Sequence, residues 1–292
     1  MKPAPFEYHA AHSLDEAFEL LARFGDEAKV LAGGQSLAPL LNMRLARPAA
    51  LVDINPLTGL DTISADGTTI TLGALVRLRA AERDREVRDR QPLLTEGLPW
   101  VGHRTIRNRG TVGGSLCHAD PAAELPAIAV ALGAEMVISS KRGSRTVPAA
   151  DFFTGFFATV LEPDELLVEC RWPPQEAGVG SAWVELALRH GDYALVGVAA
   201  VISADAAGVC RSAVLTCAGV AEKPALLIEA TEGLVGQPLN EAAVAEACEL
   251  AAVAIKPSSD LMASAAYKRR LVRVLGARAL ETAYRRATQG QK

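Results

Sequence analysis

Cysteines and aromatic residues are scarce in this chain. Aromatic side chains make up 5% of its 292 residues, and the five cysteines are Cys117, Cys170, Cys210, Cys217 and Cys248. An odd number without a CxxC pair provides neither a disulfide framework nor the ligand set of an iron–sulfur cluster. The pattern predicts reduced thiols in a cytoplasmic protein. No metal site is predicted, because His103 and His118 lack cysteine or acidic partners at metal-ligand spacing.

Long apolar runs and an excess of one charge are missing as well. No apolar stretch reaches the roughly 18 residues that a membrane-spanning helix needs. The N-terminal residues Met1 to Tyr8 lack the basic-then-apolar order of a secretory signal. Thirty basic residues are balanced by 34 acidic ones, for a net charge of −4. Nucleic-acid binding would need a strong basic footprint, and none is evident in this balance.

Two glycine doublets are the most informative features that are present: AGGQS at Ala32–Ser36 and TVGGS at Thr111–Ser115. Glycine lets a backbone approach an anion closely, and successive N–H groups in such a turn form an anion-binding concavity. Neither doublet fits the G-x-G-x-x-G fingerprint or the phosphate loop of nucleoside triphosphatases. Two similar loops in one chain predict an extended phosphate-bearing ligand, with a dinucleotide as the first hypothesis. Glycine turns that bind nothing are the alternative.

The start of the chain predicts a small βαβ unit. An apolar stripe over Ser13–Phe24 favours a helix with a capping box formed by Ser13 and Glu16, and Gly25 ends it. The pattern then predicts a strand at residues 29–32, a helix at 39–45 and a parallel strand at 50–54.

Beyond Asn55 and Pro56, the pattern changes to antiparallel strands with helices. A turn at residues 65–68 predicts a hairpin, and the charged stretch 75–90 predicts one solvent-exposed helix. Further strands are expected at 136–139, 145–147, 166–172, 195–203 and 209–218, and helices at 126–132, 240–255 and 263–286. The Pro- and Gly-rich stretch 173–180 is expected to be a boundary between the middle and the last part of the chain.

The second doublet lies within a longer run, IRNRGTVGGSLCHADPAAELP, at residues 106–126. AGGQSL at 32–37, LVDI at 51–54, LEPDELL at 161–167 and RHGDYA at 189–194 complete an ordered set. This set resembles the FAD-binding medium subunit of the molybdenum hydroxylases, the class that includes carbon monoxide dehydrogenase and bacterial xanthine dehydrogenases. The resemblance extends over nearly the whole chain.

The resemblance implies an α+β protein with the vanillyl-alcohol-oxidase (PCMH) type of FAD-binding fold. A small parallel βαβ subdomain is expected over residues 1–56 and an antiparallel-sheet subdomain over 57–177. FAD would lie between these two subdomains. A C-terminal α+β domain over 178–287 would close the site.

The resemblance also implies which residues bind the cofactor, and none of them is a catalytic nucleophile. Backbone N–H groups of one loop would line the pyrophosphate together with the Ser36 hydroxyl, and a second loop would line it from the other side. The first loop comprises Ala32, Gly33, Gly34, Gln35, Ser36 and Leu37, and the second comprises Thr111, Gly113, Gly114 and Ser115.

Further implied contacts come from outside the two loops. Val101 and Leu161 would pack on the cofactor, and Glu124, which follows the second loop with Asp120, would accept hydrogen bonds from its hydroxyls. Tyr193 would lie at the flavin edge. Capping of the following helix is the alternative role for Asp120, and ordinary core packing is the alternative for Tyr193.

Two positions depart from the family pattern. Ser115 ends the second loop where asparagine is common, but serine can still donate a hydrogen bond. Glu185 stands where a basic residue is often found near the flavin. A carboxylate there would disfavour the anionic reduced flavin, by the Coulomb effect that also shifts pKa values.

The function implied is that of an oxidoreductase subunit. FAD would bind to this chain, molybdenum-pterin to a large partner subunit, and two [2Fe–2S] clusters to a small one, in a dimer of heterotrimers. Electrons would pass from the clusters through FAD to an external acceptor. A stand-alone FAD-dependent oxidoreductase and a non-catalytic docking protein of the same fold are the alternatives. Turnover by the isolated chain, or a failure to bind flavin, would distinguish them.

Overall fold

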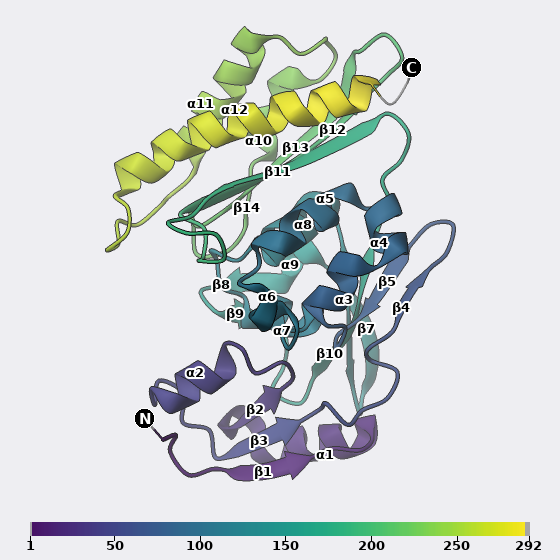
Figure 1. Ribbon diagram of the computed structural model, residues 1–292, viewed down its shortest axis with the longest axis vertical. Helices are drawn as coiled ribbons and strands as arrows, with labels where there is room; N and C mark the ends of the chain where they lie inside the picture. The colour runs from purple at the N-terminus through teal and green to yellow at the C-terminus, as the bar shows by residue number, and fades with distance from the viewer. Residues whose placement is uncertain (1, 290–292) are drawn as a thin grey trace.

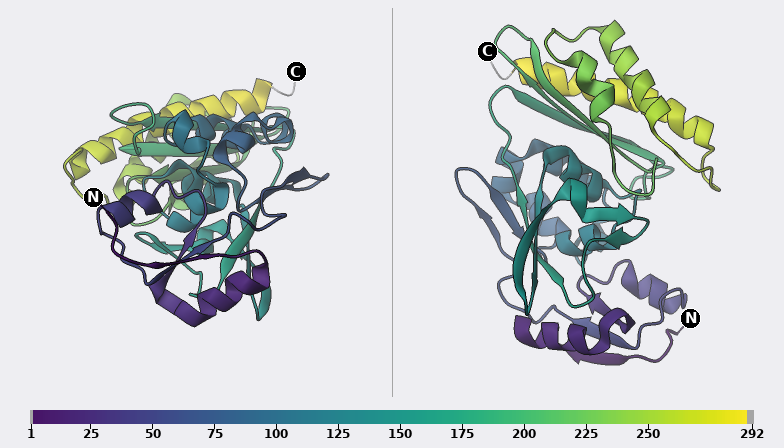
Figure 2. Two further views of the ribbon diagram at one scale, coloured as in Figure 1. Left: turned by 60° about the horizontal axis from the view of Figure 1, so that its bottom comes forward. Right: turned by 180° about the vertical axis from the view of Figure 1, so that it is seen from behind.

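Three main sheets follow one another along the long axis of the molecule in the computed structural model, which describes residues 2–289 (Figure 1). The N-terminal sheet lies at one end and the C-terminal sheet at the other, with the middle sheet and its helices between them. Figure 2 shows the same order from behind. This architecture confirms the predicted α+β class with a parallel and an antiparallel part.

The N-terminal sheet is parallel, in the order β1-β3-β2. The Ser13 hydroxyl accepts a hydrogen bond from the Glu16 N–H at 3.1 Å, as the capping box predicts. The first strand was not predicted, because four residues are too short a pattern and the strand is defined by its pairing with the distant β3. The elements are β1 (Glu7–Ala10), α1 (Leu14–Phe24), β2 (Ala28–Leu31), α2 (Leu37–Asn42) and β3 (Ala50–Asp53).

The middle part is built on an antiparallel sheet in the order β4-β5-β10-β6-β7, with a two-stranded sheet of β8 and β9 beside it. Trp172, Phe152 and Phe153 are fully buried in its core. The strands are β4 (Ile63–Ala65), β5 (Ile70–Gly73), β6 (Glu135–Ser140), β7 (Gly143–Pro148), β8 (Phe153–Gly155), β9 (Ala158–Thr159) and β10 (Leu166–Trp172). The helices are α3 (Leu78–Arg83), α4 (Arg85–Arg90), α5 (Pro92–Gly97), α6 (Arg104–Arg107), α7 (Val112–His118), α8 (Glu124–Leu132) and α9 (Ala149–Phe152).

The prediction of a single solvent-exposed helix over residues 75–90 was wrong. Two short helices, α3 and α4, occupy this stretch, and their apolar residues Leu78, Ala81 and Val87 are buried. Asp84 separates the helices, because its side chain accepts a hydrogen bond from the Val87 N–H and so caps α4. Because the stretch is rich in charged residues, its sequence carried no clear sign that one face of these helices is buried.

The C-terminal sheet is antiparallel, in the order β11-β12-β13-β14, and the long helix α12 lies across it (Figure 1). Its first strand was not predicted, because it begins inside the Pro- and Gly-rich boundary. The elements are β11 (Val179–Leu186), β12 (Val196–Ala204), β13 (Cys210–Ala218), β14 (Ala225–Leu226), α10 (Ile228–Thr231), α11 (Glu241–Ala254) and α12 (Ala265–Gln289).

All five cysteines are free, which agrees with the predicted reduced thiols. Burial raises the pKa of the Cys217 thiol to about 12, so this side chain acts as a small apolar group of the core. Within residues 2–289, none of the helices combines the length and the apolar character needed to cross a membrane.

Gly180 tests the packing of β11 against α12. A Cβ at this position would lie 2.0 Å from the Ala283 carbonyl oxygen and 2.4 Å from the Ala287 nitrogen. Because backbone atoms cannot yield as side chains do, Gly180→Ala is expected to lower the free energy of unfolding by about 1–3 kcal/mol in urea titrations. Gly233→Ala is the control, since nothing lies within 4 Å of its added Cβ. Equal stability of the two variants would contradict this packing.

Candidate functional site

The two glycine loops meet in the folded chain, although nearly eighty residues separate them. A Cβ on Gly33 would lie 2.4 Å from the Arg109 carbonyl oxygen and 2.7 Å from the Gly110 Cα. A Cβ on Gly114 would lie 3.9 Å from that of Ala32. The first doublet therefore packs backbone to backbone against the second loop, and glycine is required at Gly33 for this contact.

A pair of polar side chains outside both motifs holds the loops together. The Asn55 amide donates to the Ala32 carbonyl at 2.9 Å, and its Oδ1 accepts from Arg77 at 2.8 Å. The same guanidinium donates to the Arg109 carbonyl at 2.6 Å. Arg77 and Asn55 thus connect the first loop to the second through one continuous chain of hydrogen bonds.

The first loop presents a run of unused backbone donors. The N–H groups from Gly33 to Leu37 make no hydrogen bond to any part of the chain that the structure describes. Gly34 has a φ of 70°, which turns the loop into the concave arrangement that suits an anion. The Gln35 side chain donates to the Gly33 carbonyl at 2.9 Å and braces the turn. The loop is therefore shaped to receive a phosphate-like group.

The second loop differs, and this corrects the expectation that both loops offer free N–H groups. The Val112 and Gly113 N–H groups donate to backbone carbonyls within residues 74–76, at 2.9 and 3.0 Å. The Gly114 N–H donates to the Thr111 hydroxyl, and the Ser115 N–H to the Thr111 carbonyl, both at 3.0 Å. Thr111 is buried and caps α7. This loop forms a glycine-surfaced wall rather than a second set of donors, and its residue Ser115 is half-buried.

Tyr193 comes from the C-terminal part and reaches the first loop and the segment that follows the second loop. Its hydroxyl interacts with the side chains of Ser36, in the first loop, and Asp120, just after the second. Desolvation of the hydroxyl, followed by the negative charge of Asp120, raises the pKa of Tyr193 to about 12. Ordinary core packing does not describe this residue, because 52% of its surface is exposed.

Asp120 does not cap the next helix, which was its alternative role. Its carboxylate accepts from the Ala122 N–H at 2.9 Å, and Ala123 occupies the position before α8. Glu124 is the first residue of α8 and is 3% exposed. Burial, together with the charge of Glu185, raises the pKa of Glu124 to about 8.

Val101 and Leu161 lie on separate loops, and neither makes a hydrogen bond to the glycine loops among residues 2–289. The Val101 carbonyl accepts from Arg107, a buried guanidinium that also forms an ion pair with Glu82 at 2.9 Å. The adjacent Gly102 carbonyl accepts from Arg107 at 2.6 Å. Arg107 thus fixes two successive backbone carbonyls, those of Val101 and Gly102.

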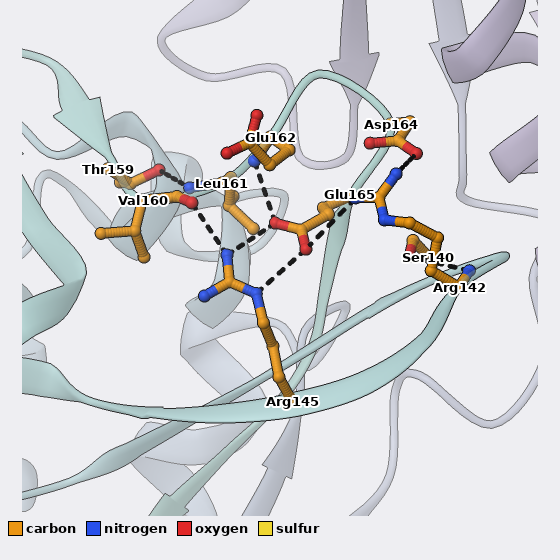
Figure 3. Close-up of polar contacts among 9 residues, drawn as sticks. All are labelled: Ser140, Arg142, Arg145, Thr159, Val160, Leu161, Glu162, Asp164 and Glu165. Carbon is orange, nitrogen blue, oxygen red and sulfur yellow. Dashed lines mark hydrogen bonds and ion pairs between the residues drawn. The ribbon is translucent and has the colours of Figure 1, made fainter.

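Arginine also anchors the loop that carries Leu161 (Figure 3). Arg145 on β7 binds both oxygens of Glu165, at 3.0 and 2.7 Å, and donates to the Val160 carbonyl at 2.9 Å. The Glu165 carboxylate also accepts from the Glu162 N–H, and the Leu161 N–H donates to Thr159. The Glu165 carboxylate of the LEPDELL motif therefore holds the loop in place, together with Arg145.

Comparison with known proteins agrees with this arrangement. Residues 4–175 match the family model described as FAD binding domain in molybdopterin dehydrogenase. Residues 181–283 match CO dehydrogenase flavoprotein C-terminal domain. The chain belongs to the family of FAD-binding medium subunits of molybdopterin dehydrogenases. The predicted resemblance is confirmed, and the chain is an oxidoreductase subunit with an FAD-binding domain.

Several relatives of this medium-subunit family match along their whole length. The 6-hydroxypseudooxynicotine dehydrogenase complex subunit alpha of Paenarthrobacter nicotinovorans is 40% identical over 98% of this chain and 97% of its own. The carbon monoxide dehydrogenase structure from Hydrogenophaga pseudoflava that lacks the Mo-pyranopterin moiety superposes with a TM-score of 0.95. It is 37% identical and covers 98% of this chain and 99% of its own. Quinoline 2-oxidoreductase from Pseudomonas putida 86 gives a TM-score of 0.93 at 38% identity, over 99% and 100% of the two chains.

Sequence patterns assigned no role to Asn55, Arg77 or Arg107. Asn55 was considered only as a breaker, yet it lies two residues after the end of β3, where a polar side chain near a strand end is a signal of a site. Arg107 lies inside the IRNRG run without a role expected for it, and Arg77 lies in a charged stretch in which only the fold distinguishes it.

Gly33→Ala tests the contact between the loops. Its Cβ would collide with the backbone at Arg109 and Gly110, so the loops must separate and the donors from Gly33 to Leu37 must shift. We expect FAD affinity to fall at least about tenfold, the cost of one well-placed charge-assisted hydrogen bond. Fluorescence titration of the apoprotein measures this. Gly67→Ala is the control, because its Cβ meets nothing within 4 Å. Equal affinities would refute the requirement for glycine.

The Arg77–Asn55 bridge is tested by a double-mutant cycle. Arg77→Lys keeps the charge but cannot serve two acceptors in a fixed fork, and Asn55→Ala removes the other half. Each is expected to lower the free energy of unfolding by about 1–3 kcal/mol, with a combined effect well below the sum, since both break one network. Arg85→Ala, at an exposed position, is the control. Additive effects in chemical denaturation would show that the two residues act independently.

Proposed function

We propose that this chain binds FAD and relays electrons from [2Fe–2S] clusters of a small partner subunit to an external acceptor. A large partner subunit would carry molybdenum-pterin and oxidise the substrate. The observation that carries the proposal is the run of unused N–H donors from Gly33 to Leu37, held by Asn55, Arg77 and the wall of the second loop.

The residues fit the cofactor because the first loop offers a run of free donor groups, which is what a pyrophosphate requires. The free N–H groups of the first loop and the Ser36 hydroxyl would bind the phosphate oxygens, since a concave run of amides favours an anion. Ala32 would complete the loop next to the Gly114 surface. Asp120 and Glu124 would accept hydrogen bonds from ribityl or ribose hydroxyls.

The apolar contacts would come from three other loops. Val101 and Leu161 would pack on the cofactor from backbones that Arg107 and Arg145 hold in place. Tyr193 would lie at the flavin edge and close the site from the C-terminal part. When bound, FAD supplies the redox chemistry by exchanging one or two electrons. The protein supplies position and electrostatics, without a side-chain nucleophile.

A cavity of about 760 Å³ next to Tyr193 provides room for the electron acceptor. Phe156, Leu188 and Met262 give it apolar walls, and Lys256 and Asp260 add charge of both signs. A volume of this size is typical of small-molecule sites. We propose that the acceptor approaches the flavin edge through this cavity.

The relatives support a multi-subunit arrangement, because their printed names describe subunits and medium chains of dehydrogenases. We propose a dimer of heterotrimers in the cytoplasm, which agrees with the free thiols.

The proposal is tested by absorbance spectra of the chain purified alone and with its co-expressed genomic neighbours. We expect flavin bands, FAD released on denaturation, and iron and molybdenum only in the co-purified complex. A chain that stays colourless after FAD is added would favour the docking protein. A yellow chain that turns over without partners would favour the stand-alone flavoenzyme.

A further inference from the structure

Asp53 ends β3, the central strand of the N-terminal sheet, beside the start of the first loop. It pairs with Ala10 of β1 and with Leu31 of β2, and the first loop begins directly after Leu31. In parallel sheets, ligands bind beyond the carboxyl ends of the strands, and Asp53 lies at that edge. Its negative charge alone would repel a pyrophosphate, so any help that it gives to binding must come through its hydrogen bonds.

Both oxygens of the Asp53 carboxylate accept hydrogen bonds. Oδ1 accepts the Asn55 backbone N–H at 2.9 Å and the Asn55 side-chain amide at 2.6 Å. Oδ2 accepts the Tyr8 hydroxyl at 2.5 Å. The bond from Tyr8 fixes the rotation of the carboxylate, so Oδ1 stays turned toward Asn55. Two bonds to one oxygen then clamp the Asn55 side chain against its own backbone.

This clamp selects one orientation of the Asn55 amide. Asn55 is exposed, and water can satisfy an exposed amide in many orientations, so burial does not select one. An ionised carboxylate has no hydrogen to donate and accepts only from the NH2 end of the amide. The second hydrogen of that NH2 group is then left for the Ala32 carbonyl, at 2.9 Å, and the amide oxygen is left for Arg77, at 2.8 Å.

Holding the Ala32 carbonyl also orients the first free donor of the loop. A trans peptide is planar, so the carbonyl of one residue and the N–H of the next point in opposite directions. A carbonyl of Ala32 turned toward Asn55 therefore directs the Gly33 N–H to the opposite side. Gln35 sets the next peptide in the same way, because its side chain holds the Gly33 carbonyl at 2.9 Å. The N–H groups of Gly33 and Gly34 both belong to the run of donors without an acceptor among residues 2–289.

We propose that Asp53 is a positioning residue for the cofactor: through Asn55 it fixes the Ala32–Gly33 peptide and so presents the Gly33 N–H to the pyrophosphate. The inference rests on the proposed function, because it concerns the affinity of the same site for FAD. Asp53 then acts on the cofactor only by way of Asn55. A residue that merely ends a strand would change stability without this dependence.

The experiment measures the FAD affinity of the full-length apoprotein by quenching of flavin fluorescence. Asp53→Ala releases Asn55 and is expected to raise the Kd about tenfold, the effect of one hydrogen bond to a charged group. Asp53→Asn keeps an oxygen for Asn55 and is expected to bring the Kd back to within about threefold of the wild type. Asp66→Ala is the matched control and is expected to bind as the wild type does. Asp66 also accepts two backbone N–H groups, but in the turn between β4 and β5.

A double-mutant cycle on FAD affinity separates positioning from a purely structural role. If Asp53 acts through Asn55, adding Asp53→Ala to Asn55→Ala changes the Kd by less than about twofold. A role at the strand end that is independent of Asn55 would instead multiply the two effects. Urea denaturation of each variant confirms that the chain being titrated is folded.

An exchange of the two side chains tests the same point without truncation. In the double variant Asp53→Asn with Asn55→Asp, an amide and a carboxylate still face each other, so folding is expected to be preserved. The carboxylate at position 55 has no hydrogen for the Ala32 carbonyl. The Kd is therefore expected to remain at least about tenfold above that of the wild type.

The outcomes distinguish this inference from the proposed function. Wild-type affinity in folded Asp53→Ala or in the exchange variant, or multiplied effects in the cycle, would overturn the role of Asp53 while leaving FAD binding intact. A wild-type chain that does not bind FAD would instead overturn the proposed function.

Discussion

The close approach of two backbone segments, at Gly33 and at Arg109–Gly110, is the constraint on which the whole site depends. Neither segment could reach the other with a Cβ at Gly33, because that atom would lie 2.4 Å from a carbonyl oxygen. Arg77 and Asn55 then hold both carbonyl-bearing backbones at this distance. The N-terminal and middle parts are joined at this point, so the shape of the candidate cofactor site follows directly from one backbone contact.

This contact also explains why the two similar motifs act differently. In the first loop, the N–H groups after Gly33 point to no acceptor in the described chain, so they are available to a ligand. In the second loop, Thr111 caps α7, and the carbonyls of Ala74 and Val76, which follow β5, accept the neighbouring N–H groups. The first loop supplies hydrogen bonds and the second supplies a close surface without side chains. Glycine serves both purposes: the first loop needs the small size of Gly33 and the conformational freedom of Gly34, and the second loop needs small size.

The electrostatics around the site follow from the joining of three parts of the chain. Tyr193, from the C-terminal part, reaches Ser36 and Asp120, and Glu185 of β11 lies within electrostatic reach of Glu124. Each acidic group loses hydration at these boundaries and gains little cationic compensation.

The sequence by itself determined the order of the main elements and the location of the first loop. Local signals were sufficient for these, such as the capping box at Ser13, the hairpin turn before β5 and the glycines of both doublets. The family resemblance then supplied the cofactor and the candidate residues. The strands β1 and β11 were not predicted. Their assignment depends on pairing with other strands rather than on their own residue pattern.

Only the tertiary structure decided which backbone donors stay free and which side chains join the loops. The same VGG sequence could have offered its N–H groups, but the carbonyls of residues 74–76 lie opposite and bind them. Arg77 resembles any other arginine in a charged stretch until the fold places it between two carbonyls. Hydrogen bonding and burial depend on neighbours far away in the chain, and a local sequence pattern does not contain that information.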